Sequence, residues 1–436
     1  MTTRKADTVT RQPNVIVFFT DQQRWDTVGA HGGRMGATPN FDRLAKTGTF
    51  VRNSFTCQPV CGPARSILQT GKYPTTTGCY RNSIALPTSE LTLAHYFRQA
   101  GYDTAYIGKW HLADTEPVPV EQRGGYEEWL ASNILEFTSY AYDTVLHDND
   151  NRAIKLPGYR VDALTDAAIR YLDRPHDKPF FLFVSYIEPH HQNQNDDYPA
   201  PAGYEDRMRE RLVMPADLEA LGGSSARHFP GYMGQIARLD EAYGRLLDAL
   251  ISLGQLDNTV VMYTSDHGNH FKTRNAEYKR SCHEASIRVP TLFIGPGFDG
   301  RGVHDGMVSL IDLPPTLLDA AGIAPPQGMQ GRSLLRDVPG PDDDVFIQVS
   351  EDHVGRALRT RRWKYEVIAP DGDGWNDMDA PRYVEAHLFD LEADPHELHN
   401  LVTAPEHIGL RARLRERLMA RMAAAGEAIP QIEAAV

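Results

Sequence analysis

Apolar residues recur in short unbroken runs along the first three quarters of the chain. NVIVFFT (14–20) is the first of them, and β-branched and aromatic residues fill most of its positions. An unbroken apolar run of this length predicts a strand buried on both faces, as in a parallel sheet. Similar runs lie within segments 91–112, 179–191, 258–268 and 289–297. Helical patterns such as TPNFDRLAKTG (38–48) alternate with the runs, which predicts a doubly wound, mostly parallel α/β sheet.

Polar residues follow the carboxyl ends of four of these predicted strands. Ligands of open α/β sheets bind at the carboxyl ends of the strands, so the pattern predicts a polar site along one edge of the sheet. The residues concerned are Asp21 and Gln22, Lys109 and His111, His190, and Asp266 and His267.

The pattern changes after about residue 340. The acidic, turn-rich stretch PGPDDDV (339–345) predicts a joint between two domains. Short runs such as FIQVS and AHLFDL then predict antiparallel strands, and GLRARLRERLMARMAAAG (409–426) predicts a final helix. We therefore expect an α/β domain over 1–340 and a smaller α+β domain with an antiparallel sheet over 341–436.

Composition and charge narrow the classes of function. The 436-residue chain carries a formal net charge of −13, which argues against nucleic acid as a partner. An acidic total does not exclude an anionic substrate, because a few local cations can govern a pocket. The polar N-terminus has no apolar export segment, and no stretch is long and apolar enough to span a membrane. We expect a cytoplasmic protein with no membrane partner, whose four cysteines are reduced thiols unless one is reactive.

The segment CQPVCGPARSILQTG (57–71) carries the most specific chemistry. Two simpler interpretations are a buried cysteine before a helix and half of a zinc site made by Cys57 and Cys61. Zinc needs about four ligands, and no second cysteine pair supplies the rest. Cys61-Gly-Pro-Ala-Arg65 followed by Thr-Gly resembles the type I sulfatase signature, in which a maturation enzyme oxidises the cysteine to formylglycine. Ala64 stands where most members have Ser; the related phosphonate monoester hydrolases also show Cys-Gly-Pro-Ala-Arg.

The resemblance extends over roughly residues 14–401, because the other motifs follow in the order of the sulfatase family. It implies an alkaline-phosphatase-like fold and a divalent cation, most often Ca²⁺, with Mn²⁺ or Mg²⁺ as alternatives. Oxygen ligands suit Ca²⁺ or Mg²⁺, whereas an imidazole also suits Mn²⁺. The implied metal ligands are Asp21, Gln22, Asp266, His267 and residue 61.

The resemblance also implies catalytic and substrate-binding residues. In this reading Arg65 and Lys109 hold the nucleophile, and His111 serves as a base. The implied contacts of the ester are His190, Lys279 and Asn82, with His283 as a further residue of the pocket. Cys57 is expected to be a nearby thiol that lines or supports the site.

The chain is therefore expected to hydrolyse a sulfate monoester of a small molecule or carbohydrate to an alcohol and inorganic sulfate. One alternative is a phosphonate monoester hydrolase or phosphodiesterase on the same scaffold. Another is a non-catalytic binding protein that keeps the metal pocket with an unmodified cysteine. The sequence leaves the oligomeric state open.

Overall fold

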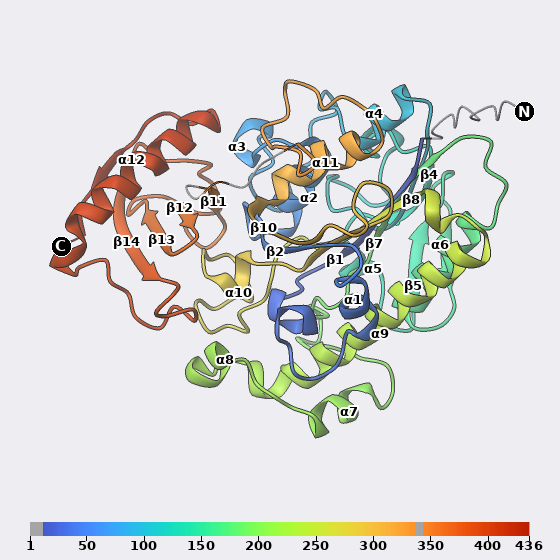
Figure 1. Ribbon diagram of the computed structural model, residues 1–436, viewed down its shortest axis with the longest axis horizontal. Coiled ribbons are helices and arrows are strands. Elements are labelled where there is room, and N and C mark those ends of the chain that lie inside the picture. The colour runs from blue at the N-terminus through green and yellow to red at the C-terminus, as the bar shows by residue number, and fades with distance from the viewer. Residues whose placement is uncertain (1–11, 337–339, 341–342, 436) are drawn as a thin grey trace, which may run out of the picture.

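Two β-sheets organise this computed structural model, which describes residues 12–336, 340 and 343–435 (Figure 1). The larger sheet has ten strands in the order β10-β2-β9-β8-β1-β7-β3-β4-β5-β6. Its strands are β1 (Asn14–Thr20), β2 (Thr49–Phe55), β3 (Asp103–Lys109), β4 (Glu128–Ser132), β5 (Thr144–His147), β6 (Ala153–Leu156), β7 (Phe180–Ser185), β8 (Thr259–Ser265), β9 (Thr291–Ile294) and β10 (Gly302–Ser309).

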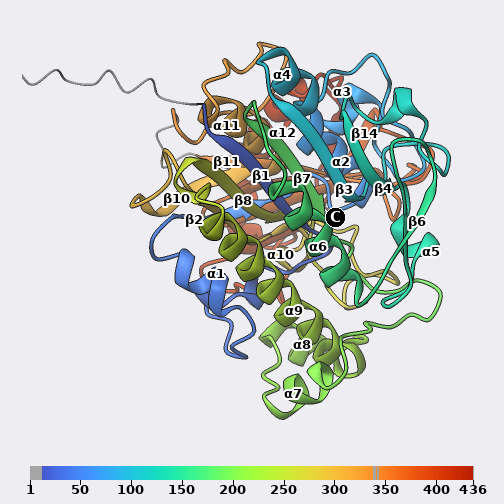
Figure 2. The ribbon, with the colours of Figure 1, turned by 90° about the vertical axis from the view of Figure 1, so that its right-hand side faces the viewer.

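Helices cover both faces of the larger sheet (Figure 2). The helices in this part of the chain are α1 (Pro39–Leu44), α2 (Cys61–Thr70), α3 (Pro74–Thr77), α4 (Leu93–Gln99), α5 (Leu135–Thr138), α6 (Arg160–Leu172), α7 (Tyr204–Glu210), α8 (Ala216–Leu221), α9 (Ser225–Ser252), α10 (Glu284–Ile287) and α11 (Leu313–Ala320). Alternate residues of β1 explain the layers. Val15 and Val17 pack in one apolar core with α2, α4 and α11, whereas Ile16 and Phe18 pack in the other with α6 and α9.

The central strands β8, β1, β7 and β3 run parallel, as the apolar runs predicted, and β4, which no predicted run covers, pairs parallel with β3. The predicted strand in 289–297 forms as β9 but runs antiparallel between β8 and β2. The helix predicted over 38–48 is shorter than expected, because α1 ends at Leu44 and the chain turns through Gly48. A Cβ at Gly48 would lie 2.3 Å from the Phe293 carbonyl oxygen, so only glycine permits this close approach.

The smaller sheet follows the larger one in sequence and confirms the antiparallel strands expected there. It has the order β11-β12-β13-β14-β15, and only the β14–β15 pair is parallel within it. Its elements are β11 (Asp344–Val349), β12 (Gly355–Thr360), β13 (Trp363–Ile368), β14 (Arg382–Asp390), β15 (Gln431–Glu433) and α12 (Ile408–Ala424). Residues 339, 341 and 342 of the predicted joint at 339–345 lie outside the described residues, and its last two residues, 344 and 345, already belong to β11, so the boundary at 340 stays a prediction.

The two sheets share an apolar core at their junction. Phe55 and Ile287, from the large-sheet side, pack with Val345 and Ile347 of β11. β11 therefore lies beside the segment that leads into α2, and its Gln348 N–H donates to the Cys57 carbonyl (2.8 Å). The smaller sheet is thus fixed against the edge where the predicted site lies.

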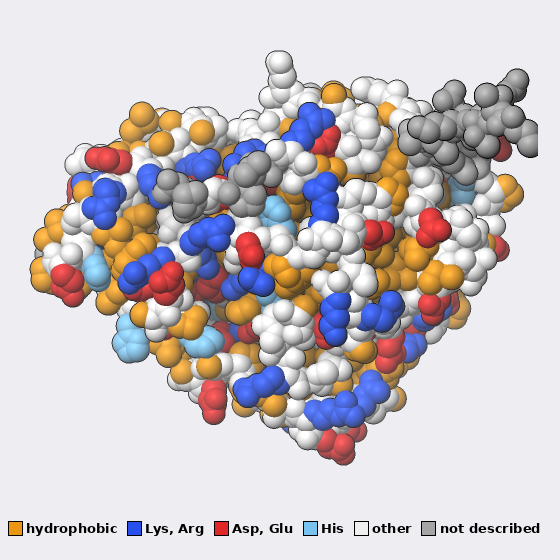
Figure 3. All heavy atoms as spheres, in the orientation of Figure 1, with side chains coloured by type: hydrophobic (Ala, Val, Ile, Leu, Met, Phe, Trp, Pro, Cys, Tyr) orange, Lys and Arg blue, Asp and Glu red, His pale blue; other side chains and the backbone are white. Residues whose placement is uncertain are grey.

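Two features of the described residues bear on partners. None of the described helices is long and apolar enough to cross a membrane. On the face that Figure 3 shows, Lys and Arg side chains are interspersed with Asp, Glu and apolar groups.

Candidate active site

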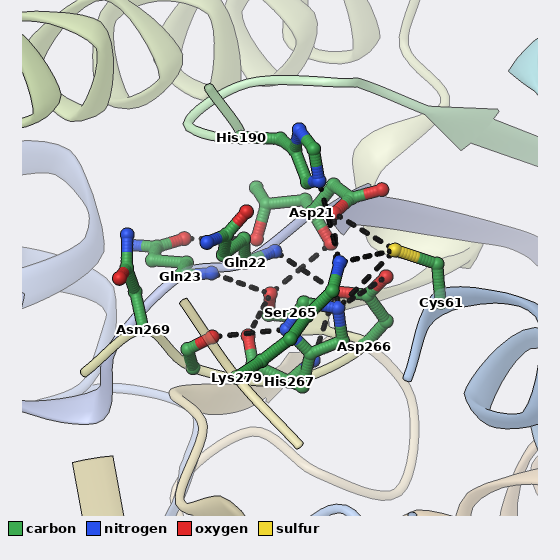
Figure 4. Close-up of polar contacts among 12 residues, drawn as sticks. Asp21, Gln22, Gln23, Cys61, His190, Ser265, Asp266, His267, Asn269 and Lys279 are labelled. Atoms are coloured by element: carbon green, nitrogen blue, oxygen red, sulfur yellow. Dashed lines mark hydrogen bonds and ion pairs between the residues drawn. The ribbon is translucent and has the colours of Figure 1, made fainter. Parts of the chain in front are cut away.

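The carboxyl ends of the parallel strands meet beside the start of α2, as the sequence predicted. Asp21 follows β1, Lys109 ends β3 and Asp266 follows β8. Cys61 is the first residue of α2, and Figure 4 shows its sulfur facing the carboxylates and Lys279. All of these residues are buried.

Local sequence explains why α2 begins at Cys61. Val60, just before the helix, has extended backbone angles, and Pro63 lies in the first helical turn, where a missing N–H costs nothing. The helix ends at Gly71, whose φ of 67° is the left-handed conformation that glycine adopts freely. The motif therefore places the cysteine at a helix N-terminus, where the helix dipole favours negative charge.

Three polar groups surround the Cys61 sulfur at close range. Its Sγ lies 2.8 Å from Lys279 Nζ, 3.3 Å from His267 Nε2 and 3.6 Å from Asp21 Oδ1. Burial and Asp21 raise the pKa of the thiol, but Lys109, Lys279 and His267 outweigh them and lower it to about 6. The site thus favours a negatively charged atom at this position.

Asp21 is the centre of a buried ionic network. Its Oδ2 accepts from Arg65 Nη2 (2.9 Å) and Lys109 Nζ (2.8 Å). Lys109 also donates to Glu136 (2.8 Å), and Arg65 donates to the Ser185 hydroxyl (2.7 Å). Burial alone would raise the pKa of Asp21, but Lys109, His190 and Arg65 hold it well below its usual value. Asp21 is therefore an anion at neutral pH.

The residues predicted to bind a divalent cation fit one. Ligand atoms of Asp21, Cys61, Asp266 and His267 all lie within 4.8 Å of one another. Both polar side-chain atoms of Gln22 are buried and have no hydrogen-bond partner among the described residues. Burial and the neighbouring Asp21 raise the pKa of Asp266 to about 7, because two carboxylates crowd one site. A cation there would relieve that repulsion and give Gln22 a partner.

The remaining predicted catalytic residues lie around the same point. Lys279 Nζ contacts His190 Nε2 (3.3 Å) as well as Cys61 Sγ (2.8 Å), so both side chains lie near Cys61. The backbone oxygen of His111 lies 3.5 Å from where a Cβ on Gly62 would be. Burial and Lys109 lower the pKa of His111 to about 3, so its imidazole is neutral at physiological pH.

Three predicted residues have contacts that the motifs did not specify. The Asn82 Oδ1 accepts from the Gly62 N–H (2.9 Å), so this side chain holds the first turn of α2. The buried His283 ring packs beside His387 and Phe389 of β14, with ring centroids 5.7 and 5.6 Å away. Cys57 is buried in the apolar core under α2, where burial raises its pKa to about 12. Cys57 thus supports the site from below.

Sequence reasoning missed Ser185 and Glu136. Ser185 is the last residue of β7, so the rule of polar strand ends would have found it. Glu136 lies in the short helix α5, beyond the end of β4, and no motif marked it. Its role became visible only because Lys109 donates to it (2.8 Å).

Comparisons with known proteins identify the family. Residues 13–323 match the model of the sulfatase family, and residues 276–424 match that of the C-terminal part of N-sulphoglucosamine sulphohydrolase. The chain is 32% identical over 440 residues to an ulvan-active sulfatase of Formosa agariphila, covering 95% of this chain and 82% of that protein. It is 26% identical over 497 residues to an N-acetylglucosamine-6-O-sulfatase of Bacteroides thetaiotaomicron, covering 94% and 86% respectively.

A solved structure of a putative sulfatase from Bacteroides fragilis has the same fold. Its TM-score is 0.83 at 25% identity, covering 96% of this chain and 97% of that one. The chain belongs to the sulfatase family. It is a sulfatase, a hydrolase of sulfate esters, and the family implies a divalent cation at the cluster described above.

Proposed function

We propose that the chain hydrolyses a sulfate monoester of a carbohydrate or other small alcohol, with residue 61 converted to formylglycine. The observation that carries this proposal is the position of the Cys61 sulfur among Lys279, His267 and Asp21. A nucleophile at this point would lie next to the oxygen atoms that bind the divalent cation. The negatively charged ester that it attacks would lie next to positively charged side chains. A sugar as the alcohol is supported by the named relative that is an N-acetylglucosamine-6-O-sulfatase.

We propose Ca²⁺ as the cation, held by Asp21, Gln22, Asp266 and His267 together with residue 61. Asp21, Gln22 and Asp266 offer oxygen, which suits Ca²⁺ and leaves Mg²⁺ as a candidate, while the His267 imidazole leaves Mn²⁺ as another. When bound, the cation supplies positive charge next to the nucleophile and the sulfate oxygens, and lowers the pKa of a hydroxyl on residue 61.

The chain's own residues would divide the proton transfers between them. Arg65 and Lys109 fix Asp21 and add positive charge (contacts of 2.9 and 2.8 Å). Lys279 and His190 would hold the ester oxygens and protonate the leaving alkoxide, which departs as the alcohol. His111 is neutral and would accept the proton of the second hydroxyl of hydrated formylglycine, so that the aldehyde re-forms and sulfate leaves.

Two measurements test the proposal. Mass spectrometry of the peptide that contains residue 61, after expression with a formylglycine-generating enzyme, should show an aldehyde in place of the thiol. An unmodified cysteine from the native host would support the binding-protein alternative. We also propose a cytoplasmic location, where that maturation enzyme would have to act.

The second measurement compares ester classes. Matched aryl sulfate, phosphonate monoester and phosphodiester substrates, followed by sulfated sugars and choline sulfate, should give the highest kcat/KM for a sulfate. A dominant phosphonate rate would overturn the proposal in favour of the alternative that Ala64 raised. If a sulfate is preferred, the sulfate ester with the highest kcat/KM in the panel identifies the leaving alcohol.

A further inference from the structure

The turn after β11 brings one buried carboxylate from the smaller sheet to the edge of the active site. Gln58 Nε2 donates to the Ser350 hydroxyl (2.7 Å), and that hydroxyl donates to the Tyr80 carbonyl (2.8 Å). The turn is therefore tied to the segments on either side of α2. Glu351 comes next in the chain, and only 1% of its side chain is exposed.

One carboxylate oxygen of Glu351 supports the nucleophile's helix. Glu351 Oε1 accepts from the Asn82 N–H (2.6 Å). Asn82 in turn accepts from the Gly62 N–H (2.9 Å), and Gly62 is the residue after Cys61. Two hydrogen bonds therefore connect Glu351 to the first turn of α2.

The other oxygen supports the lysine that touches the nucleophile. Glu351 Oε2 lies 2.6 Å from Arg280 Nη2, in an ion pair whose arginine side chain is 19% exposed. Arg280 follows Lys279, whose Nζ lies 2.8 Å from Cys61 Sγ. The Arg280 N–H also donates to the Pro59 carbonyl (3.3 Å), so this segment lies along the approach to α2.

The backbone at both ends of this ion pair is in an uncommon conformation. Glu351 and Arg280 each have a φ of 69°, in the left-handed region that non-glycine residues seldom adopt. The Glu351 N–H is held by the Gly374 carbonyl (2.6 Å). Such conformations cost free energy and persist where surrounding contacts fix them, which they do often at functional sites.

We propose that Glu351 is a positioning residue for the sulfatase reaction. Its two oxygens set the distance between the first turn of α2 and the segment that contains Lys279. They thereby set the distance between residue 61 and the Lys279 ammonium group. Glu351 touches neither the nucleophile nor the ester, and its role rests on the proposed function of residue 61 and Lys279. The smaller sheet thereby takes part in catalysis through one side chain.

The competing explanation is that the Glu351–Arg280 pair only stabilises the fold. Glu385 of β14 is a matched control, because its side chain is 2% exposed and pairs with Arg411 of α12 (2.5 Å) in the same part of the chain. Loss of Glu351 removes one of the two carboxylate partners of Arg280, which also pairs with Glu277 (3.0 Å), and loss of Glu385 removes the partner of the buried Arg411. Only Glu351 connects to Gly62 and Lys279 by the contacts described above.

The experiment compares Glu351→Gln, Arg280→Gln, the double variant and Glu385→Gln, each produced with the maturation enzyme. The glutamine at 351 keeps an oxygen for the Asn82 N–H but loses the charge opposite Arg280. Activity is measured on the ester that the wild-type protein hydrolyses best. It is divided by the fraction of residue 61 converted to formylglycine, which mass spectrometry of the peptide containing residue 61 provides. Melting temperature is measured in parallel.

We expect Glu351→Gln to lower kcat/KM by about 10- to 100-fold, the usual effect of removing an outer support of a site. The kcat/KM of Glu385→Gln should stay within about twofold of the wild-type value, even if its melting temperature falls as much as that of Glu351→Gln. The double variant should be no slower than the slower single variant, because both act through one pair. Equal kcat/KM for Glu351→Gln and Glu385→Gln, or multiplicative losses in the double variant, would overturn the inference.

Three arms keep the result clear. If Glu351→Gln does not fold, Glu351→Asp retains the charge with a shorter reach and is judged by the same criteria. If the protein prefers a phosphonate to a sulfate, the proposed function fails while Glu351 is still judged on the phosphonate. If it hydrolyses neither, calorimetry with inorganic sulfate decides: about tenfold weaker binding in Glu351→Gln supports the inference, and equal binding overturns it.

Discussion

Cys61 and Cys57 show how two cysteines four residues apart acquire different environments. Cys61 faces Lys279 and His267 at the start of α2, whereas Cys57 is packed in the apolar core below it. The pKa of Cys61 is lowered to about 6 although burial opposes this, and burial raises that of Cys57 to about 12. The helix N-terminus and the cations therefore single out one of the two thiols.

Substitution of each cysteine separates their roles. Cys61→Ala should abolish ester hydrolysis, because it removes the group that becomes the nucleophile. Cys57→Ser should retain most of the turnover and lose stability, because a hydroxyl is buried in an apolar core. Initial rates with an aryl sulfate and urea unfolding measure the two effects. A reversed pattern of activity loss would contradict the assignment.

Lys109 is the most enclosed cation of the site. It is fully buried and donates to both Asp21 and Glu136 at 2.8 Å. Lys109→Met should lower the free energy of unfolding by about 3–5 kcal/mol, because the buried Glu136 carboxylate loses its partner and Asp21 is left with Arg65. Urea unfolding monitored by circular dichroism measures the change.

Two further variants frame this prediction. Lys178→Met breaks an exposed pair with Asp103 (3.2 Å) and should change stability by less than about 1 kcal/mol. Adding Glu136→Gln to Lys109→Met should restore part of the loss, since it removes the charge that Lys109→Met leaves unpaired. A Lys109→Met protein as stable as Lys178→Met would show that the buried network contributes little to folding.

At the scale of elements, β13 and β14 carry a second charged cluster away from the nucleophile. His353, in the turn before β12, contacts Asp352 (2.7 Å) and Glu366 of β13 (3.3 Å). Glu366 also pairs with His387 of β14 (2.6 Å). Burial would lower the pKa of His353, but hydrogen bonds to the two carboxylates outweigh it and raise the pKa to about 9.

This raised pKa makes the smaller sheet sensitive to alkaline pH. Because the folded pKa lies above the ordinary value of about 6.5, the stabilisation is complete below pH 6.5 and is lost as pH rises through 9. Between pH 6.5 and 9.5, the free energy of unfolding of the wild-type protein should fall by about 2–3 kcal/mol more than that of His353→Gln. Urea unfolding at the two pH values tests this, and equal losses would rule out His353 as the titrating group.

At the scale of the whole molecule, the cation site joins segments that lie far apart in the chain. Asp21 and Asp266 are 245 positions apart in sequence, yet Arg65 contacts both, at 2.9 and 3.9 Å. A cation that binds only the folded site stabilises it by mass action, by about 2.7 kcal/mol at a hundredfold excess over its Kd.

Removal of the cation should therefore affect folding and turnover together. Treatment with EDTA should abolish hydrolysis and lower the melting temperature, and Ca²⁺ should restore both at lower concentration than Mg²⁺ or Mn²⁺. Asp266→Asn, measured beside it, should weaken the response to Ca²⁺. An EDTA-treated protein with unchanged melting temperature and full turnover would contradict the predicted site.

Much of the fold could be predicted because local patterns specify it. The run at 14–20 is apolar at every position but its ends, and it forms a strand buried on both faces. The carboxyl ends of such strands are placed on one edge by topology, which is why Asp21, Lys109 and Asp266 could be grouped before any coordinates were known. The direction of β9 and the early end of α1 were not predicted, because pairing partners and close backbone approaches are long-range properties.

The sequence by itself determined the nucleophile segment, because Cys61, Pro63 and Arg65 lie within one helical turn and their spacing is local. It also determined the candidate ligands that follow strands. Only the tertiary structure decided which groups support them: Glu136 beside Lys109, and Glu351 from the smaller sheet beside Asn82 and Arg280. Packing between segments that are distant in sequence brings such partners together, and no pattern within either segment predicts that contact.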